Sequence, residues 1–261
     1  MSAAEPLLSQ SSPNGLLSRL PGPVLEALAP RLRRHQLPVG QVLHGPGDTA
    51  QVVWFSLGSM LSQIASGSEG ETVETAAVGL EGALGLTEAL ASGRLYNQAV
   101  VQVDGEALSM PAAEARRLAA TETAFAEMAW ISAEMQALEA RQSSLCQAHH
   151  PVEHRLARWL GETFDRTGNR TVLPLTQEYI AAMMGVQRTT VNAFATQLQK
   201  AGLIRYSRGR VTICDVEGLD GRACECRSVL REHRDRLGIA TFRERGRSAG
   251  DLSLTSQGIN T

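Results

Sequence analysis

The residues between Gln187 and Lys200 place hydrogen-bonding side chains in a helical pattern. On a helical wheel, Val191, Phe194, Ala195 and Leu198 share one arc, which is typical of a face packed on a core. A separate arc carries the polar residues Arg188, Thr189, Asn192, Thr196, Gln199 and Lys200. One face of this helix is therefore expected to pack, while the other offers a guanidinium, hydroxyls and amides to a partner.

Those polar groups match the exposed edges of base pairs. An arginine can bind guanine O6 and N7 through two hydrogen bonds, and Asn or Thr can read other edges. Upstream, Thr176 is a good N-cap for a helix over 177–184. Gly185 can then supply the left-handed backbone of a tight turn. Two short helices joined through a glycine indicate a helix-turn-helix whose second helix, over 187–201, enters a DNA major groove.

A short hairpin is predicted directly after these helices. The apolar runs 204–206 and 211–213 flank Ser207-Arg208-Gly209-Arg210, so two arginines stand at the tip and Arg205 lies nearby. Such a wing can reach phosphates. The local charge agrees, since residues 151–214 carry nine basic and four acidic residues, whereas residues 1–150 carry eight and fifteen. A generic helical hairpin with a solvated polar surface remains the alternative.

The preceding part of the chain must hold this segment in place. Short apolar or alternating runs, bounded by Gly, Pro and Asp turns, predict a compact antiparallel β-roll or jelly roll. The runs are 41–43, 52–55, 60–64, 72–78, 99–103 and 107–110. Two short helices around Pro21-Gly22-Pro23 are expected before them, and a short helix over 112–118 after them. The predicted class is thus α+β.

A long helix is predicted from about 123 to 147, because that stretch contains no Gly or Pro. Apolar residues at alternating steps of four and three form a heptad seam, which favours a partner helix over packing on the roll. The seam contains Met128, Ile131, Met135, Leu138, Gln142 and Leu145. The expected organisation is a disordered N-terminus (1–13), a β-roll (14–120), a central dimerisation helix (121–149), a winged helix-turn-helix with a C-terminal helix (150–238) and a disordered tail (239–261).

The stretch from Leu175 to Val191, LTQEYIAAMMGVQRTTV, followed by LQKAGLI at 198–204 and the short wing, resembles the DNA-reading motif of the Crp/Fnr transcription regulators. The resemblance covers roughly residues 14–238 and implies a homodimer reading a near-palindromic operator. It assigns guanine reading to Arg188 and phosphate contacts to Thr176 and Gln177; Thr189 replaces the glutamate common there. We expect DNA contacts from Thr176, Gln177, Gln187, Arg188, Thr189, Thr190, Asn192, Arg205, Arg208 and Arg210.

The presumed sensor segment departs from the family's cyclic-nucleotide pattern. Gly82, Ala83 and Leu84 stand where a Gly-Glu-Leu segment binds ribose, and Ala83 cannot accept a hydrogen bond from the ribose hydroxyls. Neither Asn97 nor Gln98 supplies the positive charge for the phosphate, and Arg94 lies two or three residues early. Cyclic AMP is not expected to bind in the usual mode. Whether the roll binds another ligand, binds none, or serves as a scaffold stays open.

Other chemistry finds little support in the sequence. No cysteine precedes Cys146, which argues against the family's N-terminal iron–sulfur cluster. Cys224 and Cys226 are predicted to point apart on one helix over 217–237, so no metal site is expected there. His149, His150 and His154 are assigned capping or surface roles, and His35 and His44 are not expected to bind haem.

The rival functions are a cupin-like metal enzyme and a dimeric protein-interaction module that does not bind DNA. The chain has no His-x-His pair, Walker loop or GxSxG motif, so an enzyme is not expected. It also has neither a signal peptide nor a run of eighteen apolar residues, which favours a soluble cytoplasmic protein. The expected partners are double-stranded DNA, a second copy of the chain and RNA polymerase, with no membrane. No cofactor is predicted, and the small-molecule effector is not identified.

Overall fold

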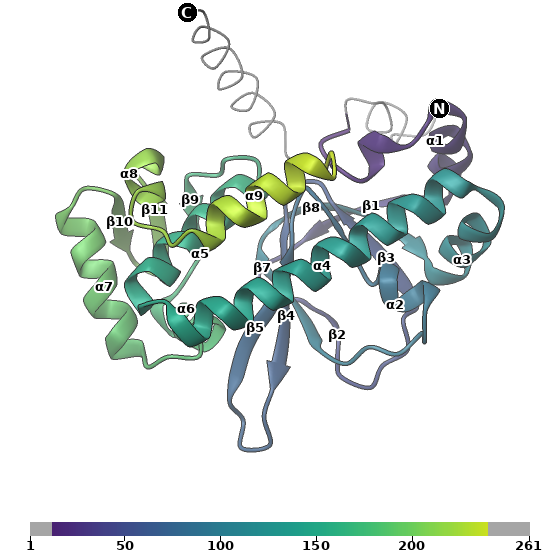
Figure 1. Cartoon of the computed structure of the whole chain (residues 1–261). Coiled ribbons are helices and arrows are strands. Elements are labelled where there is room, and N and C mark those ends of the chain that lie inside the picture. Colours follow the sequence, from purple (N-terminus) through teal and green to yellow (C-terminus); the bar gives the residue numbers. More distant parts are fainter. Residues whose placement is uncertain (1–11, 240–261) are drawn as a thin grey trace, which may run out of the picture.

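A computed structural model describes residues 12–239. The first half is a β-roll of two four-stranded antiparallel sheets, ordered β1-β8-β3-β6 and β2-β7-β4-β5 (Figure 1). The strands are β1 (Arg33–Leu37), β2 (Val42–His44), β3 (Val52–Ser56), β4 (Met60–Ser66), β5 (Thr72–Val78), β6 (Ala83–Leu84), β7 (Gln98–Val103) and β8 (Gly105–Pro111). The predicted roll is confirmed, and each predicted run overlaps a strand.

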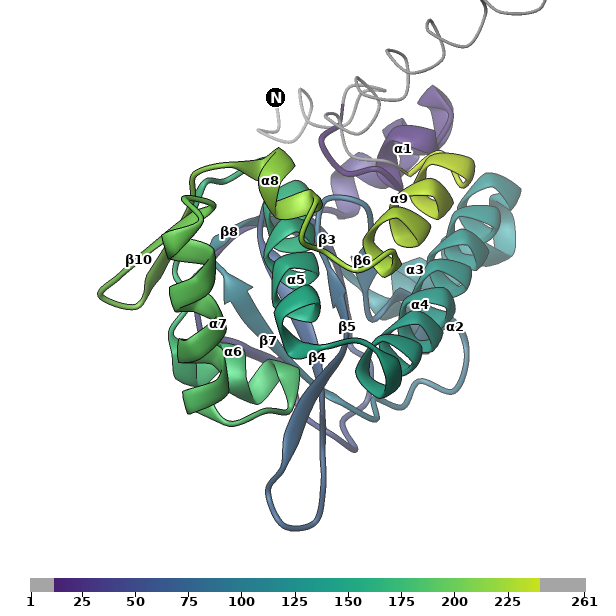
Figure 2. The same cartoon turned by 60° about the vertical axis from the view of Figure 1, so that its left-hand side comes forward.

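Short helices cover one end of the roll. They are η2 (Leu17–Arg19), α1 (Gly22–Leu28), η3 (Ala29–Arg31), α2 (Leu86–Leu90) and α3 (Ala112–Thr121). Their apolar sides join strand β3 and the first half of the long helix α4 (Thr123–His149) in one core, which includes Leu28, Phe55 and Phe125. The helix α9 (Cys226–Arg236) packs alongside α4 (Figure 2).

The remaining elements form the unit at the left of Figure 1. They are α5 (Val152–Arg166), β9 (Val172–Leu173), α6 (Gln177–Met184), α7 (Arg188–Lys200), β10 (Ile204–Ser207), β11 (Arg210–Ile213) and α8 (Val216–Asp220). The three strands make a small sheet ordered β10-β11-β9. The predicted winged helix-turn-helix is therefore present, with helix ends within one residue of those expected.

This C-terminal unit packs directly on the roll. Leu160 and Phe164 of α5 and Met183 of α6 share one hydrophobic core with Met60 and Ile64 of β4. The hydroxyl of Tyr179, also in α6, donates to the Ser62 hydroxyl over 3.4 Å. The sequence did not predict this contact, because the apolar periodicity of α6 shows only that one face is buried, not which surface covers it.

Buried ion pairs reinforce the junction. The Arg166 guanidinium at the end of α5 donates to Glu81 of the roll at 2.9 Å and to Glu139 of α4 at 2.7 Å, and all three side chains are at most 8% exposed. Next to them, Arg234 of α9 binds Glu162 of α5 at 2.8 Å. Burial alone would raise the pKa of Glu162, but Arg234 and Arg227 outweigh it and lower that pKa to about 2. Ion pairs between buried side chains therefore link the roll to α4, α5 and α9.

Two local predictions are wrong. Strand β1 was missed because its sequence, Arg-Arg-His-Gln-Leu, is mostly polar; it lies at a sheet edge with only Leu37 buried, so it lacks an apolar pattern. The single helix predicted over 217–237 is broken: α8 ends at Asp220, and α9 begins only at Cys226. The bend between them lets Cys224 and Cys226 face the same neighbours.

The predicted disordered ends lie mostly outside the described range. Residues 1–11 and 240–261 are not described, whereas Ser12 and Ile239, at the two borders, are buried. Within residues 12–239, no helix combines the length and the apolarity needed to cross a membrane.

Candidate nucleic-acid interface

The turn between α6 and α7 has the predicted construction. The Thr176 hydroxyl accepts a hydrogen bond from the Tyr179 backbone N–H at 3.1 Å and so caps α6. Gly185 ends α6 at φ 62°, a left-handed conformation that glycine adopts without strain. Val191, Ala195 and Leu198 then anchor α7 in the core, because each is at most 5% exposed. This anchoring fixes which face of α7 points outward.

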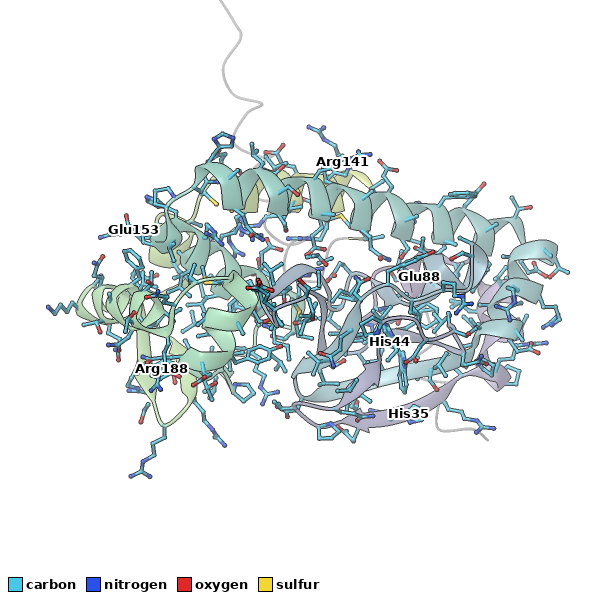
Figure 3. All side chains as sticks on the ribbon, turned by 90° about the horizontal axis from the view of Figure 1, so that it is seen from below. His35, His44, Glu88, Arg141, Glu153 and Arg188 are labelled. Carbon is cyan, nitrogen blue, oxygen red and sulfur yellow. The ribbon has the colours of Figure 1, made fainter. Side chains whose placement is uncertain are left out.

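The outward face carries the predicted reading residues. Gln187, Arg188, Thr189 and Asn192 are exposed or half-buried, as is Thr190. The Arg188 side chain, 67% exposed, has its nearest acidic partner in Glu178 at 3.8 Å, a separation too long for a hydrogen bond. Figure 3 labels Arg188 at the end of the molecule away from His35 and His44 of the roll. These side chains are thus free to meet an external surface.

The first helix contributes to the same surface. The Gln177 side-chain amide donates to the Asn192 side-chain oxygen at 3.0 Å, which links the start of α6 to the exposed face of α7. Thr176, one residue earlier, is exposed. The two residues that the resemblance assigns to phosphate contacts therefore lie beside the residues that it assigns to base reading.

The wing approaches this surface from the other side. In the hairpin of β10 and β11, Ser207 pairs with Arg210 across a tip in which Arg208 and Gly209 have φ values of 47° and 73°. A Cβ on Gly209 would lie 3.3 Å from the methyl group of Thr176, so the tip touches the N-terminus of α6. Arg205, Arg208 and Arg210 are all exposed. Three arginines therefore border the α6–α7 surface.

Tyr206 holds the wing in that position. Its hydroxyl donates to the Leu175 carbonyl oxygen at 2.9 Å, and its backbone N–H donates to the Gln199 side chain at 2.8 Å. Burial raises the pKa of the Tyr206 phenol, so the hydroxyl keeps the proton that it donates. Tyr206 thereby connects the wing to the segment just before α6 and to the end of α7.

The predicted ligand-pocket residues do not line one open cavity. Ala83 and Leu84 are buried within β6, while the side chain of Arg94 is exposed and donates to the Gly47 carbonyl oxygen at 3.3 Å. Asn97 donates to Gln63, and Gln98 pairs with Ile64 in the sheet. The cavity that Gly82 and Ala83 line with α4 measures about 10 Å³, which is too small for a nucleotide.

The predicted dimer seam is largely covered by its own protomer. Met128 and Met135 are 1% and 4% exposed, and Ile131 and Leu138 pack against the same core of the roll and its helices. Gln142 is half-buried, and Leu145 is 46% exposed. Met128 and Met135 are therefore wrong as contacts to a partner helix, because periodicity shows that a stripe is buried but not by what.

The comparisons with known proteins agree with this architecture. Residues 154–222 match the Crp-like helix-turn-helix domain family. FixK2 from Bradyrhizobium japonicum has a similar structure, with 15% identity over 74% of this chain and 98% of its own, at a TM-score of 0.61. The regulator TTHB099 of the CRP family from Thermus thermophilus is 17% identical over 73% of this chain and 96% of its own, at a TM-score of 0.60.

A further similar structure is that of the c-di-GMP-responsive global regulator CLP from Xanthomonas campestris. It is 15% identical over 74% of this chain and 99% of its own, with a TM-score of 0.59. No curated protein matches the chain in sequence. The resemblance seen in residues 175–204 is thus confirmed: the chain carries a Crp-like helix-turn-helix domain and has the fold of the Crp/Fnr transcription regulators.

Proposed function

We propose that the protein is a sequence-specific DNA-binding transcription regulator. The observation that carries this proposal is a single exposed surface made by the polar face of α7, the N-terminus of α6 and the arginines of the wing. A convex helix with outward Arg, Thr and Asn side chains suits a major groove, and the flanking arginines suit the phosphates beside it.

The position of each residue on this surface suggests whether it contacts bases or phosphates. Arg188 and Asn192, in the first two turns of α7, are the proposed base readers, together with Thr189. Thr176, Gln177 and the wing arginines are the proposed phosphate contacts, because they border α7 rather than extend its outer face.

Replacing Arg208 and Arg210 together by alanine should weaken binding to every DNA sequence alike. Each protomer of the bound dimer then neutralises two fewer phosphates, four in all, so the slope of log K against log salt should become shallower by about 4. Mobility-shift titrations at several salt concentrations, on a selected operator and on a random duplex, measure both effects. The matched control is Arg33→Ala with Arg117→Ala, two exposed arginines of the roll half, which should leave the slope unchanged. A loss confined to the operator would mean that the wing reads bases.

We propose further that the regulator acts as a homodimer joined through a seam of exposed and half-buried residues on α4. The seam runs at alternating steps of four and three along the face opposite the buried methionines. It consists of Ala126, Trp130, Ala133, Ala137, Ala140 and Ser144. Trp130 is 76% exposed, and Ala140 is exposed as well. Small side chains let two helices approach closely, and a large exposed tryptophan favours burial against a partner.

Ala137→Glu should convert the dimer into a 28.0 kDa monomer, because two carboxylates would face each other across the two-fold axis without a partner. Glutamate is a strong helix former, so α4 itself should persist. Light scattering coupled to size exclusion reports the mass. Ser66→Glu adds the same charge at an exposed position of β4 and should remain dimeric. An Ala137→Glu protein that keeps the wild-type dimer mass would place the interface elsewhere.

The two reader helices of such a dimer would enter successive major grooves about 34 Å apart, which requires a near-palindromic operator. RNA polymerase is the proposed partner of the operator-bound dimer. We propose no cyclic-AMP site of the usual mode, since Ala83 and Asn97 leave the ribose and the phosphate without their partners. An effector that binds one arrangement of the dimer better than another would shift the population toward it.

A further inference from the structure

Four potential metal ligands meet where α4 ends beside α9. Cys146 and His150 are four residues apart at the end of α4, and Cys224 and Cys226 come from the bend before α9 and from its first residue. One ligand atom from each of these four residues lies within 4.8 Å of the other three. The Sγ atoms of Cys146 and Cys224 are 3.5 Å apart, and Cys226 Sγ is 3.3 Å from His150 Nδ1. All four cysteines of the chain are free thiols.

The dimensions fit one small ion. A tetrahedral Zn²⁺ with Zn–S bonds of about 2.3 Å sets its sulfur ligands about 3.8 Å apart. A four-iron cluster would need a wider cradle, because each thiolate ligates a different iron. Three thiolates and one imidazole form a standard set for structural zinc, and soft sulfur ligands disfavour Mg²⁺ and Ca²⁺.

The surroundings also fit a metal ligand set. The second ring nitrogen of His150, Nε2, lies 3.0 Å from a carboxylate oxygen of Glu225. A ligating histidine commonly donates its other N–H to such a carboxylate, which fixes the tautomer and the ring orientation. Cys146 and Cys226 are fully buried, and Cys224 is 7% exposed, so the pocket is closed to solvent on the sulfur side.

A charged neighbour completes the arrangement. Zinc with three thiolates and a neutral imidazole carries a net charge of −1. The guanidinium of Arg158 on α5 interacts electrostatically with Cys146 and Cys224, and its buried Nε atom lacks a hydrogen-bond partner in the described structure. Such a cation offsets the residual charge of the site.

We propose that Cys146, His150, Cys224 and Cys226 bind one structural Zn²⁺ that fastens α9 to the end of α4. Residues far apart in the sequence supply the ligands, so the ion closes a long loop around the helix-turn-helix. This inference does not depend on DNA binding. It differs from the sequence-based prediction, which placed Cys224 and Cys226 on one regular helix and assigned His150 a capping or surface role.

The test uses the tag-free full-length protein. Mass spectrometry of the metals should find one zinc per chain in the wild type and in Cys214→Ser, whose thiol is exposed and outside the cluster. Cys224→Ser and Cys226→Ser should lose it. Cobalt added to the chelator-treated protein should give the intense visible bands of tetrahedral Co²⁺ with a thiolate charge-transfer band.

A variant at an exposed position keeps the proposal testable if the cysteine variants misfold. Glu225 is 66% exposed at its side chain, so Glu225→Ala should fold and yet bind zinc about 10-fold to 100-fold more weakly, since it removes only the partner of His150. Wild-type protein that is purified without metal and gives an octahedral cobalt spectrum would overturn the proposal. So would wild-type protein that contains iron and labile sulfide, or one in which Cys146 and Cys224 form a disulfide. None of these results would bear on whether the protein binds DNA.

Discussion

Replacing Arg166 by alanine is expected to lower the free energy of unfolding by about 3–5 kcal/mol, the usual cost of leaving buried charges without their partner. Arg166 is 3% exposed at its side chain and binds Glu81 and Glu139, which come from two other parts of the fold. Its removal strands two carboxylates between the roll, α4 and α5. Urea denaturation followed by circular dichroism measures the loss.

Arg117→Ala is the matched control, because Arg117 pairs with Glu114 on the surface of α3, where the two side chains are 46% and 36% exposed. Such a pair contributes at most about 1 kcal/mol. If Arg166→Ala were no more destabilising than Arg117→Ala, the buried network would not join the two halves of the molecule as described.

Replacing Arg188 by alanine is expected to cost about 1–3 kcal/mol of binding free energy for each half-site and to relax base preference at one position in each half-site. The reason is its placement: Arg188 opens α7, is exposed, and stands on a helix whose opposite face is fixed in the core. Competition binding against operators changed one base pair at a time measures the effect. If the variant lost the same affinity for every operator, whatever base pair was changed, Arg188 would contact a phosphate and not a base.

Arg33→Ala supplies the control for this experiment as well. Arg33 is an exposed arginine of strand β1 on the roll, so its removal changes the net charge equally but touches no proposed DNA contact. Its operator affinity and base preference should equal those of the wild type. A matching loss in both variants would mean that total charge, not position, governs binding.

The helix-turn-helix could be predicted from the sequence because neighbouring residues determine its structure. Thr176 as a cap, Gly185 at a turn and the apolar spacing of α7 each specify structure within a few residues, and all three agree with the structure. Strand β1 was not predictable in this way, since an edge strand with one buried residue leaves almost no pattern.

Contacts between distant segments were the part that sequence could not provide. The heptad pattern of α4 identified a buried stripe, but the roll covers Met128 and Met135, and the seam around Trp130 consists mostly of alanines that carry little hydrophobic signal. The cluster of Cys146 with Cys224 depends on the bend between α8 and α9 and on the packing of α9 against α4. Neither follows from residue spacing alone.

In vitro selection from a pool of random duplexes, with the full-length protein at physiological salt, tests the central claim most directly. We expect an enriched site with two inverted half-sites whose centres lie about one helical turn, ~34 Å, apart. The Arg188→Ala protein should lose preference at one symmetric pair of positions within that site. Recovery of unrelated sequences with no repeated half-site, or no enrichment at all, would contradict the assignment of α7 as a reader of DNA.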